Sequence, residues 1–151
     1  MNTTRPTILS LNVSPGGIPK IPVSPVELTP SGLAGDGHNH DKHCTPQQAV
    51  SILDAEDLLD LSAEGFDVYP GAMGENITVQ DLDVDELEIG DRLFFSGGVS
   101  VELTRRRSPC YVLDAIDLEL KRASRGRIGW YGKVLEPGHV HDGEEISVVH
   151  P

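Results

Sequence analysis

Short apolar runs recur along the chain, and turn-forming residues (Gly, Pro, Asn and Asp) separate them. Runs of this kind are typical of β-strands, because turn residues interrupt the chain before a helix can develop. Counting the weakest runs, we predict about nine strands. The strand-like segments include residues 7–13, 26–28, 77–79, 99–103, 130–135 and 145–149, and residues 89–95 are a turn followed by a strand.

The segment that follows the first third of the chain admits two interpretations. Residues 45–48 match a capping box, which would begin a helix there. The apolar run 49–53 is equally typical of a buried strand, with Asp54 capping a helix over 55–63 and Gly65 ending it. The leucines at 58, 59 and 61 fit an amphipathic helix in both interpretations. We prefer the second interpretation, a strand followed by a helix.

A second helix is predicted near residue 110. Apolar residues spaced four apart, from Val112 to Leu120, would share one helical face. Ser108 is a natural N-cap and Pro109 a natural first helical residue. This arrangement predicts that Cys110 lies in the first helical turn.

About nine strands with two short helices predict a mainly β fold, closed or strongly bent into a β-barrel. The 16 glycines and 11 prolines also favour short strands and turns over long helices. We expect residues 1–151 to form a single domain, because a chain of this length can bury one core of its own.

Charge limits the classes of partner. The chain has 12 Lys and Arg against 24 Asp and Glu, a formal net charge of -12. This excess of acid argues against nucleic acid or an anionic membrane as the main partner. No apolar stretch approaches the roughly 20 residues needed to cross a bilayer, and no signal peptide is evident. We interpret the two cysteines as reduced thiols and expect a cytoplasmic protein.

Cys110 is the strongest chemical candidate. Unpaired N–H groups at a helix start and the adjacent cations Arg105, Arg106 and Arg107 would both lower the pKa of its thiol. The thiolate is the form that attacks sulfur or binds a metal. Arg125 and Arg127 add further cations, so an anionic ligand such as a phosphate is expected. The alternative is a set of ion-paired arginines at a strand end, and an inert buried thiol.

Other polar residues gather in loops. His38, His40, His43 and Cys44 lie close together, yet their spacing fits no closed zinc pattern, so hydrogen-bonding walls of a pocket are the preferred interpretation. Cys44 could also form a disulfide with an oxidised Cys110 if this loop folds over the pocket.

Three further candidates are less specific. Glu75 and Asn76 follow glycines that let the backbone approach a ligand, although a plain polar turn would look the same. Lys20, held in an extended segment by flanking prolines, is either a pocket residue or a solvated surface lysine. Asp36 lies in a turn-rich loop.

Taken together, these residues resemble the MOSC domain, a module similar to the C-terminal part of molybdenum cofactor sulfurases that also occurs as small stand-alone bacterial proteins. Each fragment alone is weak, but the ordered set is specific and spans roughly residues 7–149. The family pattern also places a strand at 49–53. The matching pieces are GIPK at 17–20, GLAGD at 32–36, His43 with Ala49 and Val50, PG at 70–71, GEN at 74–76, IGD at 89–91, RSPC at 107–110, and residues 131–138.

The resemblance implies a β-barrel-like fold and a cysteine, Cys110, that carries sulfur or coordinates molybdenum. It also implies that the molybdenum cofactor is bound by family pocket positions, which here are Lys20, Asp36, His43, Glu75, Asn76 and Arg107. To these we add Arg105 and Arg127 because of their charge. Two departures concern the cofactor-facing wall. Cys44 and Thr45 stand where members often have two glycines, and Gln48 stands where they often have arginine.

Two functions follow. In the first, the protein is a sulfurtransferase: Cys110 accepts a sulfur atom as a persulfide from a cysteine desulfurase or another donor and passes it to the molybdenum cofactor or a molybdoenzyme. In the second, the protein is a molybdopterin-binding module with Cys110 as a molybdenum ligand and no sulfur turnover. We expect no pyridoxal phosphate in this chain alone, because the domain that holds it in full-length sulfurases has no counterpart here, so this chain cannot mobilise sulfur from cysteine by that route.

Overall fold

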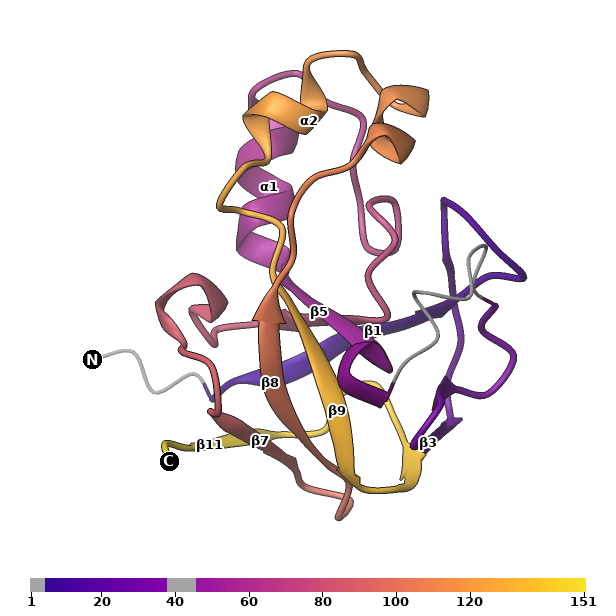
Figure 1. Cartoon of the computed structure of the whole chain (residues 1–151), viewed down its shortest axis with the longest axis vertical. Helices are drawn as coiled ribbons and strands as arrows, with labels where there is room; N and C mark the ends of the chain where they lie inside the picture. Colours follow the sequence, from indigo (N-terminus) through magenta and orange to yellow (C-terminus); the bar gives the residue numbers. More distant parts are fainter. Residues whose placement is uncertain (1–4, 38–45) are drawn as a thin grey trace.

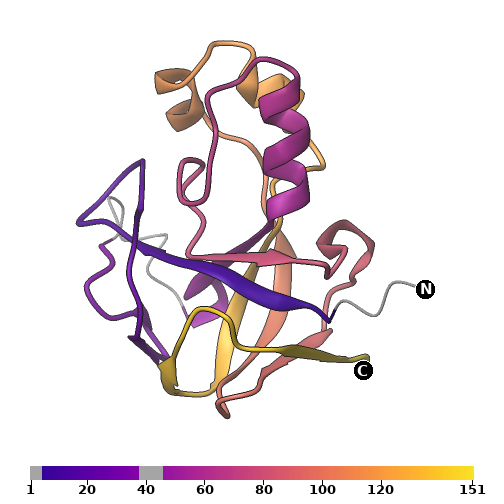
Figure 2. The same ribbon diagram turned by 180° about the vertical axis from the view of Figure 1, so that it is seen from behind.

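The chain folds into a β-rich body with a smaller helical lobe beside it (Figures 1 and 2). The computed structural model describes residues 5–37 and 46–151. The strands are β1 (Thr7–Val13), β2 (Ile21–Pro22), β3 (Val26–Thr29), β4 (Gly32–Leu33), β5 (Val50–Asp54), β6 (Ile77–Gln80), β7 (Arg92–Phe95), β8 (Ser100–Arg106), β9 (Trp130–Glu136), β10 (Gly138–Val140) and β11 (Ile146–Val149).

Eight of these strands form one sheet in the order β11-β7-β8-β9-β5-β6-β1-β2, and three form a small sheet in the order β10-β3-β4. The β5–β6 pair is parallel, with Ile52 opposite Ile77, and the other ladders are antiparallel. A parallel pair needs a crossover connection, and the helix α1 (Ala55–Ala63) lies in that connection. The preferred interpretation, a strand followed by a helix, is therefore confirmed.

Alternation along the strands decides which side chains enter the sheet core. In β1, Ile8 and Leu11 are both buried, and a bulge in the ladder with β6 lies between them. In β7, Leu93 and Phe95 are buried while Arg92 and Phe94 are exposed. Every residue of β5 is buried, because both of its faces are covered. Such a strand reads as a continuous apolar run rather than an alternating one.

The helical lobe has its own apolar core. Leu58 and Leu61 of α1 pack there with Met73, Leu113 and Leu120. The C-terminus of α1 is closed as predicted at Gly65, where φ is +104° and the Phe66 N–H donates to the Leu61 carbonyl. The lobe sits where β8 and β9 emerge from the sheet, so the segment after β8 passes directly into it (Figure 1).

The prediction of one continuous helix after Cys110 is wrong. The chain makes a short 3₁₀ helix, η4 (Tyr111–Ala115), and then a one-turn α-helix, α2 (Leu120–Ala123). Cys110 is the N-cap of η4 and does not lie in a first helical turn capped by Ser108. The break occurs at Asp117, whose side chain accepts a hydrogen bond from the Glu119 N–H and so competes with a continuous helix.

The mainly β fold with few short helices is confirmed, but the predicted closed barrel is not. Among the described residues, β1 and the start of β11 are joined by an isolated bridge between Thr7 and Glu145 rather than by a ladder. Backbone hydrogen bonds beside the bridge, such as Ile8 N–H to the Glu144 carbonyl at 2.9 Å, bring the two edges together. The sheet is thus strongly bent without a continuous closing ladder.

Within the described part of the chain, no helix has the length and apolar character required to span a membrane.

Candidate functional site

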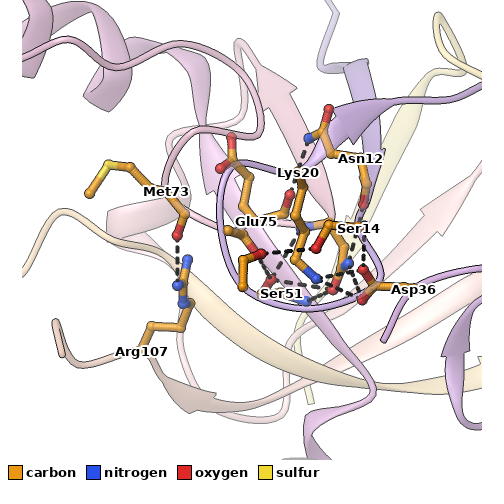
Figure 3. A network of polar contacts seen from close by, with 11 residues as sticks. Asn12, Ser14, Lys20, Asp36, Ser51, Met73, Glu75 and Arg107 are labelled. Carbon is orange, nitrogen blue, oxygen red and sulfur yellow. Dashed lines mark hydrogen bonds and ion pairs between the residues drawn. The ribbon is translucent and has the colours of Figure 1, made fainter. Parts of the chain in front are cut away.

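A cluster of buried polar side chains lies where the first part of the chain, β5 and the loop before β6 meet (Figure 3). At its centre is an ion pair. The Lys20 ammonium lies 2.7 Å from both carboxylate oxygens of Asp36. Their side chains are only 11% and 2% exposed, respectively. A pair this dry persists only when other hydrogen bonds satisfy its remaining atoms.

Asp36 receives those additional hydrogen bonds. The Ser14 backbone N–H donates to its Oδ1 at 3.0 Å, and the Asn76 side-chain amide donates to its Oδ2 at 2.9 Å. Asn76 in turn accepts from the Ser51 backbone N–H at 3.0 Å. Asn76 therefore ties the ion pair to the centre of the large sheet through β5, which fixes its position.

Glu75 is fully buried beside this pair, in the loop that precedes β6. Its Oε2 accepts from the Gly71 N–H at 2.9 Å and from the Thr78 hydroxyl at 2.7 Å. Its Oε1 is buried, and no residue in the described part of the chain donates a hydrogen bond to it. Burial raises the pKa of the Glu75 carboxyl, and the two donors and the Arg107 charge partly oppose that rise. A buried oxygen with no donor is a position at which a ligand or water can bind.

Arg107 carries unused donors in the same region. Its Nη2 donates to the Met73 carbonyl at 3.0 Å (Figure 3). Its guanidinium lies 5.8 Å from the centre of the Tyr131 ring. Its Nε and Nη1 are buried and have no hydrogen-bond partner among the described residues. Leaving buried donors of a charged group unpaired is costly. These N–H groups are therefore suited to an anionic ligand.

The loop of residues 70–76 carries several of these groups, and glycine lets it pack closely. Gly71 has φ +91°, and a Cβ atom there would lie 2.2 Å from the Lys20 carbonyl oxygen. The Lys20 N–H donates to the Gly71 carbonyl at 2.9 Å. Only glycine permits this approach, which brings Lys20 and Glu75 to the same site.

Cys110 lies three residues after Arg107, so the two Cα atoms are at most roughly 11 Å apart. Its side chain is an exposed free thiol. Among the described residues, no hydrogen bond or ion pair joins its sulfur to any of the neighbouring arginines. Arg106 instead stacks on Trp130, 4.4 Å from the ring centre, and donates to the carbonyls of Asp85 and Leu87.

The structure thus brings together five of the predicted site residues: Lys20, Asp36, Glu75, Asn76 and Arg107. Arg105 and Arg127 have different surroundings. Arg105 is exposed and lines a shallow surface pocket with Arg106 and Trp130. Arg127 forms a two-point ion pair with Glu64, with its shortest contact at 2.6 Å, and also donates to the Ala123 carbonyl. The ligand roles of these residues stay predictions.

His43, together with His38, His40 and Cys44, lies outside the described residues. The pocket role of His43 and the Cys44–Cys110 disulfide therefore stay predictions.

Sequence reasoning missed two members of the cluster that lie inside strands. Asn12 in β1 donates to the Glu75 carbonyl at 3.1 Å and to the Thr78 hydroxyl at 3.0 Å. Ser51 in β5 bonds to Asn76. The available signal was weak: each is a polar residue within an otherwise apolar run, where a buried polar group needs a partner.

Comparison with known proteins agrees with this architecture. A protein named reductase from Gibberella moniliformis is 32% identical over 133 residues, which cover 83% of this chain but 24% of that protein. Escherichia coli YiiM is 32% identical over 147 residues, which cover 89% of this chain and 64% of YiiM. The chain therefore spans less than two thirds of the length of either relative.

The fold agrees with that of a solved structure. The crystal structure of the YuaD protein from Bacillus subtilis superposes with a TM-score of 0.83 over 96% of both chains, at 19% identity, which shows a shared fold. Residues 39–147 match the MOSC domain family. Because that match covers most of the sequence, and the motifs from Gly17 to Cys110 occur in the family's order, this chain belongs to the MOSC domain family.

Proposed function

We propose that this protein binds the molybdenum cofactor, with Arg107 holding an anionic group of the pterin and Cys110 providing a sulfur ligand to the metal. The observation that carries this proposal is the pair of buried, unpartnered N–H groups on Arg107. MOSC domains are associated with molybdenum cofactor-related proteins. The cofactor, when bound, supplies a redox-active metal with soft sulfur ligation.

The residues present fit such a ligand. A guanidinium with two free donors can bind a phosphate in a two-point geometry, which Lys cannot reproduce. The Lys20–Asp36 pair is internally neutral, so the positive charge of Arg107 is left for an anion. Thiolate sulfur is a soft ligand of the kind that sulfur-rich metal centres accept. The exposed position of Cys110 makes its sulfur reachable from solvent.

The remaining buried residues would position the ligand rather than contact the metal. Glu75 and Asn76 fix the loop of residues 70–76, whose Met73 carbonyl orients the Arg107 guanidinium. The Tyr131 ring supports the same guanidinium from β9. Arg107 is therefore held from two sides, which reduces the entropy lost when it binds an anion.

A direct test is to measure molybdenum and pterin in protein purified from a host that makes the cofactor. We expect the wild-type protein to carry both. Arg107→Gln should reduce retention at least about tenfold, because a charge-assisted hydrogen bond contributes about 1.5–3 kcal/mol. Arg122→Gln, which removes an exposed arginine on α2, is the matched control and should behave as wild type.

Cys110→Ser separates the two parts of the proposal, since it should retain pterin while losing molybdenum. Circular dichroism establishes that each variant is folded. Wild-type protein without molybdenum or pterin, or a folded Arg107→Gln variant that retains both, would contradict cofactor binding.

The exposure of the Cys110 thiol favours a second candidate, sulfur transfer. In this reaction the Cys110 thiolate attacks the terminal sulfur of a donor persulfide. A new S–S bond forms at Cys110, and the donor cysteine leaves as a thiolate. The terminal sulfur is then passed to the acceptor, which regenerates the Cys110 thiolate. A cysteine desulfurase is the expected donor.

Mass spectrometry after incubation with a desulfurase and cysteine tests this second candidate. Sulfur transfer predicts a mass increase of about 32 Da on Cys110, which is absent in Cys110→Ser. Equal labelling of the variant, or no adduct on the wild type, would exclude sulfur transfer and leave cofactor binding unaffected.

A further inference from the structure

Three carboxylates that take no part in the candidate site gather at the end of β5. One oxygen from each of Asp54, Asp57 and Asp85 lies within 4.8 Å of the other two. Asp54 is the last residue of β5, Asp57 lies in the first turn of α1, and Asp85 lies in the 3₁₀ helix η3 (Val84–Glu86). Figures 1 and 2 show the turn containing η3 beside the base of α1.

The backbone around the cluster is held in place by hydrogen bonds. Asp54 Oδ2 accepts from the Val84 N–H at 2.8 Å, and the Val84 carbonyl accepts from the Trp130 indole N–H at 3.0 Å. Arg106 donates to the Asp85 carbonyl at 3.0 Å. The segments that carry the three carboxylates are therefore held rigidly by these hydrogen bonds, and the cluster does not depend on a free loop.

Each of the three carboxylates has one buried oxygen without a partner among the described residues. These oxygens are Asp54 Oδ1, Asp57 Oδ2 and Asp85 Oδ1, and Asp54 and Asp57 are only 3% and 7% exposed. No lysine or arginine within the described residues forms an ion pair with any of the three. Buried charges without a counter-charge are strongly unfavourable. Burial raises the pKa of Asp54 to about 7 and that of Asp57 to about 8.

We propose that Asp54, Asp57 and Asp85 bind one hard divalent cation of the Ca²⁺, Mn²⁺ or Mg²⁺ class. An ion of this class takes carboxylate oxygens and completes its coordination with water. Ca²⁺ binds oxygen at about 2.3–2.6 Å, so two ligands of one ion lie up to about 5 Å apart. The 4.8 Å limit on the distances in this cluster is compatible with one shared ion.

The competing occupant is a proton. When Asp57 is protonated it can donate to Asp85, which is a second way of relieving repulsion between two buried carboxylates. A proton between two groups leaves Asp54 Oδ1 unpartnered, whereas a cation satisfies all three oxygens together. A cation would also join β5, α1 and η3, so its expected role is to stabilise the junction of the sheet and the helical lobe.

Terbium luminescence provides a direct test, because Tb³⁺ takes the same hard oxygen ligands as Ca²⁺. The chain has one tryptophan, Trp130. Its indole N–H donates a hydrogen bond to the carbonyl of Val84, the residue next to Asp85. Excitation of the indole should therefore produce sensitised Tb³⁺ emission. Titration with Ca²⁺, Mn²⁺ or Mg²⁺ in separate experiments should displace Tb³⁺ and identify the preferred ion.

Two variants define the site. Asp85→Asn should weaken Tb³⁺ affinity by at least about tenfold, since loss of even an outer-shell partner weakens metal sites by about 10–100-fold. Asp83→Asn makes the same charge change at an exposed residue of the same turn, where φ of +60° also suits Asn, and should bind as wild type.

Thermal unfolding supplies the second measurement. Millimolar amounts of the preferred cation should raise the wild-type midpoint above that in chelator, and should not raise the midpoint of Asp85→Asn. Absence of sensitised emission, equal affinity in the Asp85→Asn and wild-type proteins, or an unfolding midpoint independent of all three cations would overturn the proposal. Any of these results would leave a shared proton as the occupant.

Discussion

Lys20 and Asp36 show how single residues in this protein are stabilised by their surroundings. Neither charge is near bulk water: each is paired with the other, and Asp36 also accepts hydrogen bonds from amide donors of distant segments. Removing one partner of such a pair lowers the free energy of unfolding by more than the intact pair contributes, because an uncompensated buried charge remains. Stability therefore depends on Lys20 even though it lies in a loop.

Lys20→Met should lower the free energy of unfolding by about 3 kcal/mol, because Asp36 keeps its amide donors but loses its counter-charge. Urea denaturation with an unchanged m-value measures this loss. Lys121→Met, at an exposed position of α2, should change stability by less than about 0.5 kcal/mol. Equal stabilities of the two variants would show that the Lys20–Asp36 pair makes no net contribution.

Glu75 should make stability depend on pH. Its folded-state pKa is raised by burial above the ordinary value of 4.5, so the folded protein binds this proton more tightly than the unfolded chain. The resulting stabilisation is fully present below a pH of about 4.5 and is lost as the pH rises through the folded-state pKa. Glu75→Gln should therefore lose less stability than the wild type as the pH rises.

Urea denaturation at several pH values, in the presence of chelator, measures the difference in slope between the two proteins. Glu119→Gln, which changes an exposed carboxyl, should follow the wild-type slope. A Glu75→Gln slope equal to that of the wild type would mean that Glu75 is ionised in the folded protein at the same pH as in the unfolded chain.

At the scale of elements, the loop of residues 70–76 joins the two parts of the candidate site. Its Gly71 N–H donates to Glu75, its Gly71 carbonyl accepts from the Lys20 N–H, and its Met73 carbonyl orients Arg107. A single irregular segment thus sets the positions of three charged side chains. Its shape depends on a backbone conformation that only glycine adopts readily.

Gly71→Ala should disrupt this loop, because the new Cβ would lie 2.2 Å from the Lys20 carbonyl oxygen. Gly126→Ala is a matched control, since φ there is +79° and no atom lies within 4 Å of a new Cβ. Both variants carry the strain of a positive φ, and overpacking should make Gly71→Ala about 1–3 kcal/mol less stable than Gly126→Ala. Chemical denaturation measures the free energy of unfolding that each variant loses. Equal losses would contradict the close approach of Gly71 to Lys20.

At the scale of the whole molecule, net charge opposes folding. The formal charge of -12 concentrates repulsion in the compact state. Within the described residues, the arginines and lysines in surface ion pairs, such as Arg92 with Glu102, offset only part of this repulsion. Screening by salt should therefore weaken the repulsion between like charges more than the attraction within the surface ion pairs.

Raising NaCl from about 10 mM to about 150 mM, which shortens the screening length from about 30 Å to about 8 Å, should raise the thermal unfolding midpoint. The measurement is made in chelator so that divalent ions do not contribute. A midpoint that falls with added salt would show that surface ion pairs outweigh the general repulsion.

The sequence alone determined the elements whose signals are local. Strand β1, helix α1 and its stop at Gly65 follow from apolar periodicity and glycine chemistry, which act within a few residues. The ordered motifs, through their resemblance to the MOSC family, also grouped Lys20, Asp36, Glu75, Asn76 and Arg107 as one set of candidate residues, because each of them lies in one of the short motifs. The prediction of a continuous helix after Cys110 was wrong for a local reason, because the Asp117 side chain competes for a backbone N–H.

Only the tertiary structure decided which polar groups meet and which remain without partners. The polar residues Asn12 and Ser51 join the site because β1 and β5 flank β6 in the sheet. Asp54, Asp57 and Asp85 converge because η3 packs beside the β5–α1 junction. Sheet order and loop packing join residues far apart in the chain. The resulting burial, which sets the electrostatics of both clusters, is therefore a property of the folded molecule.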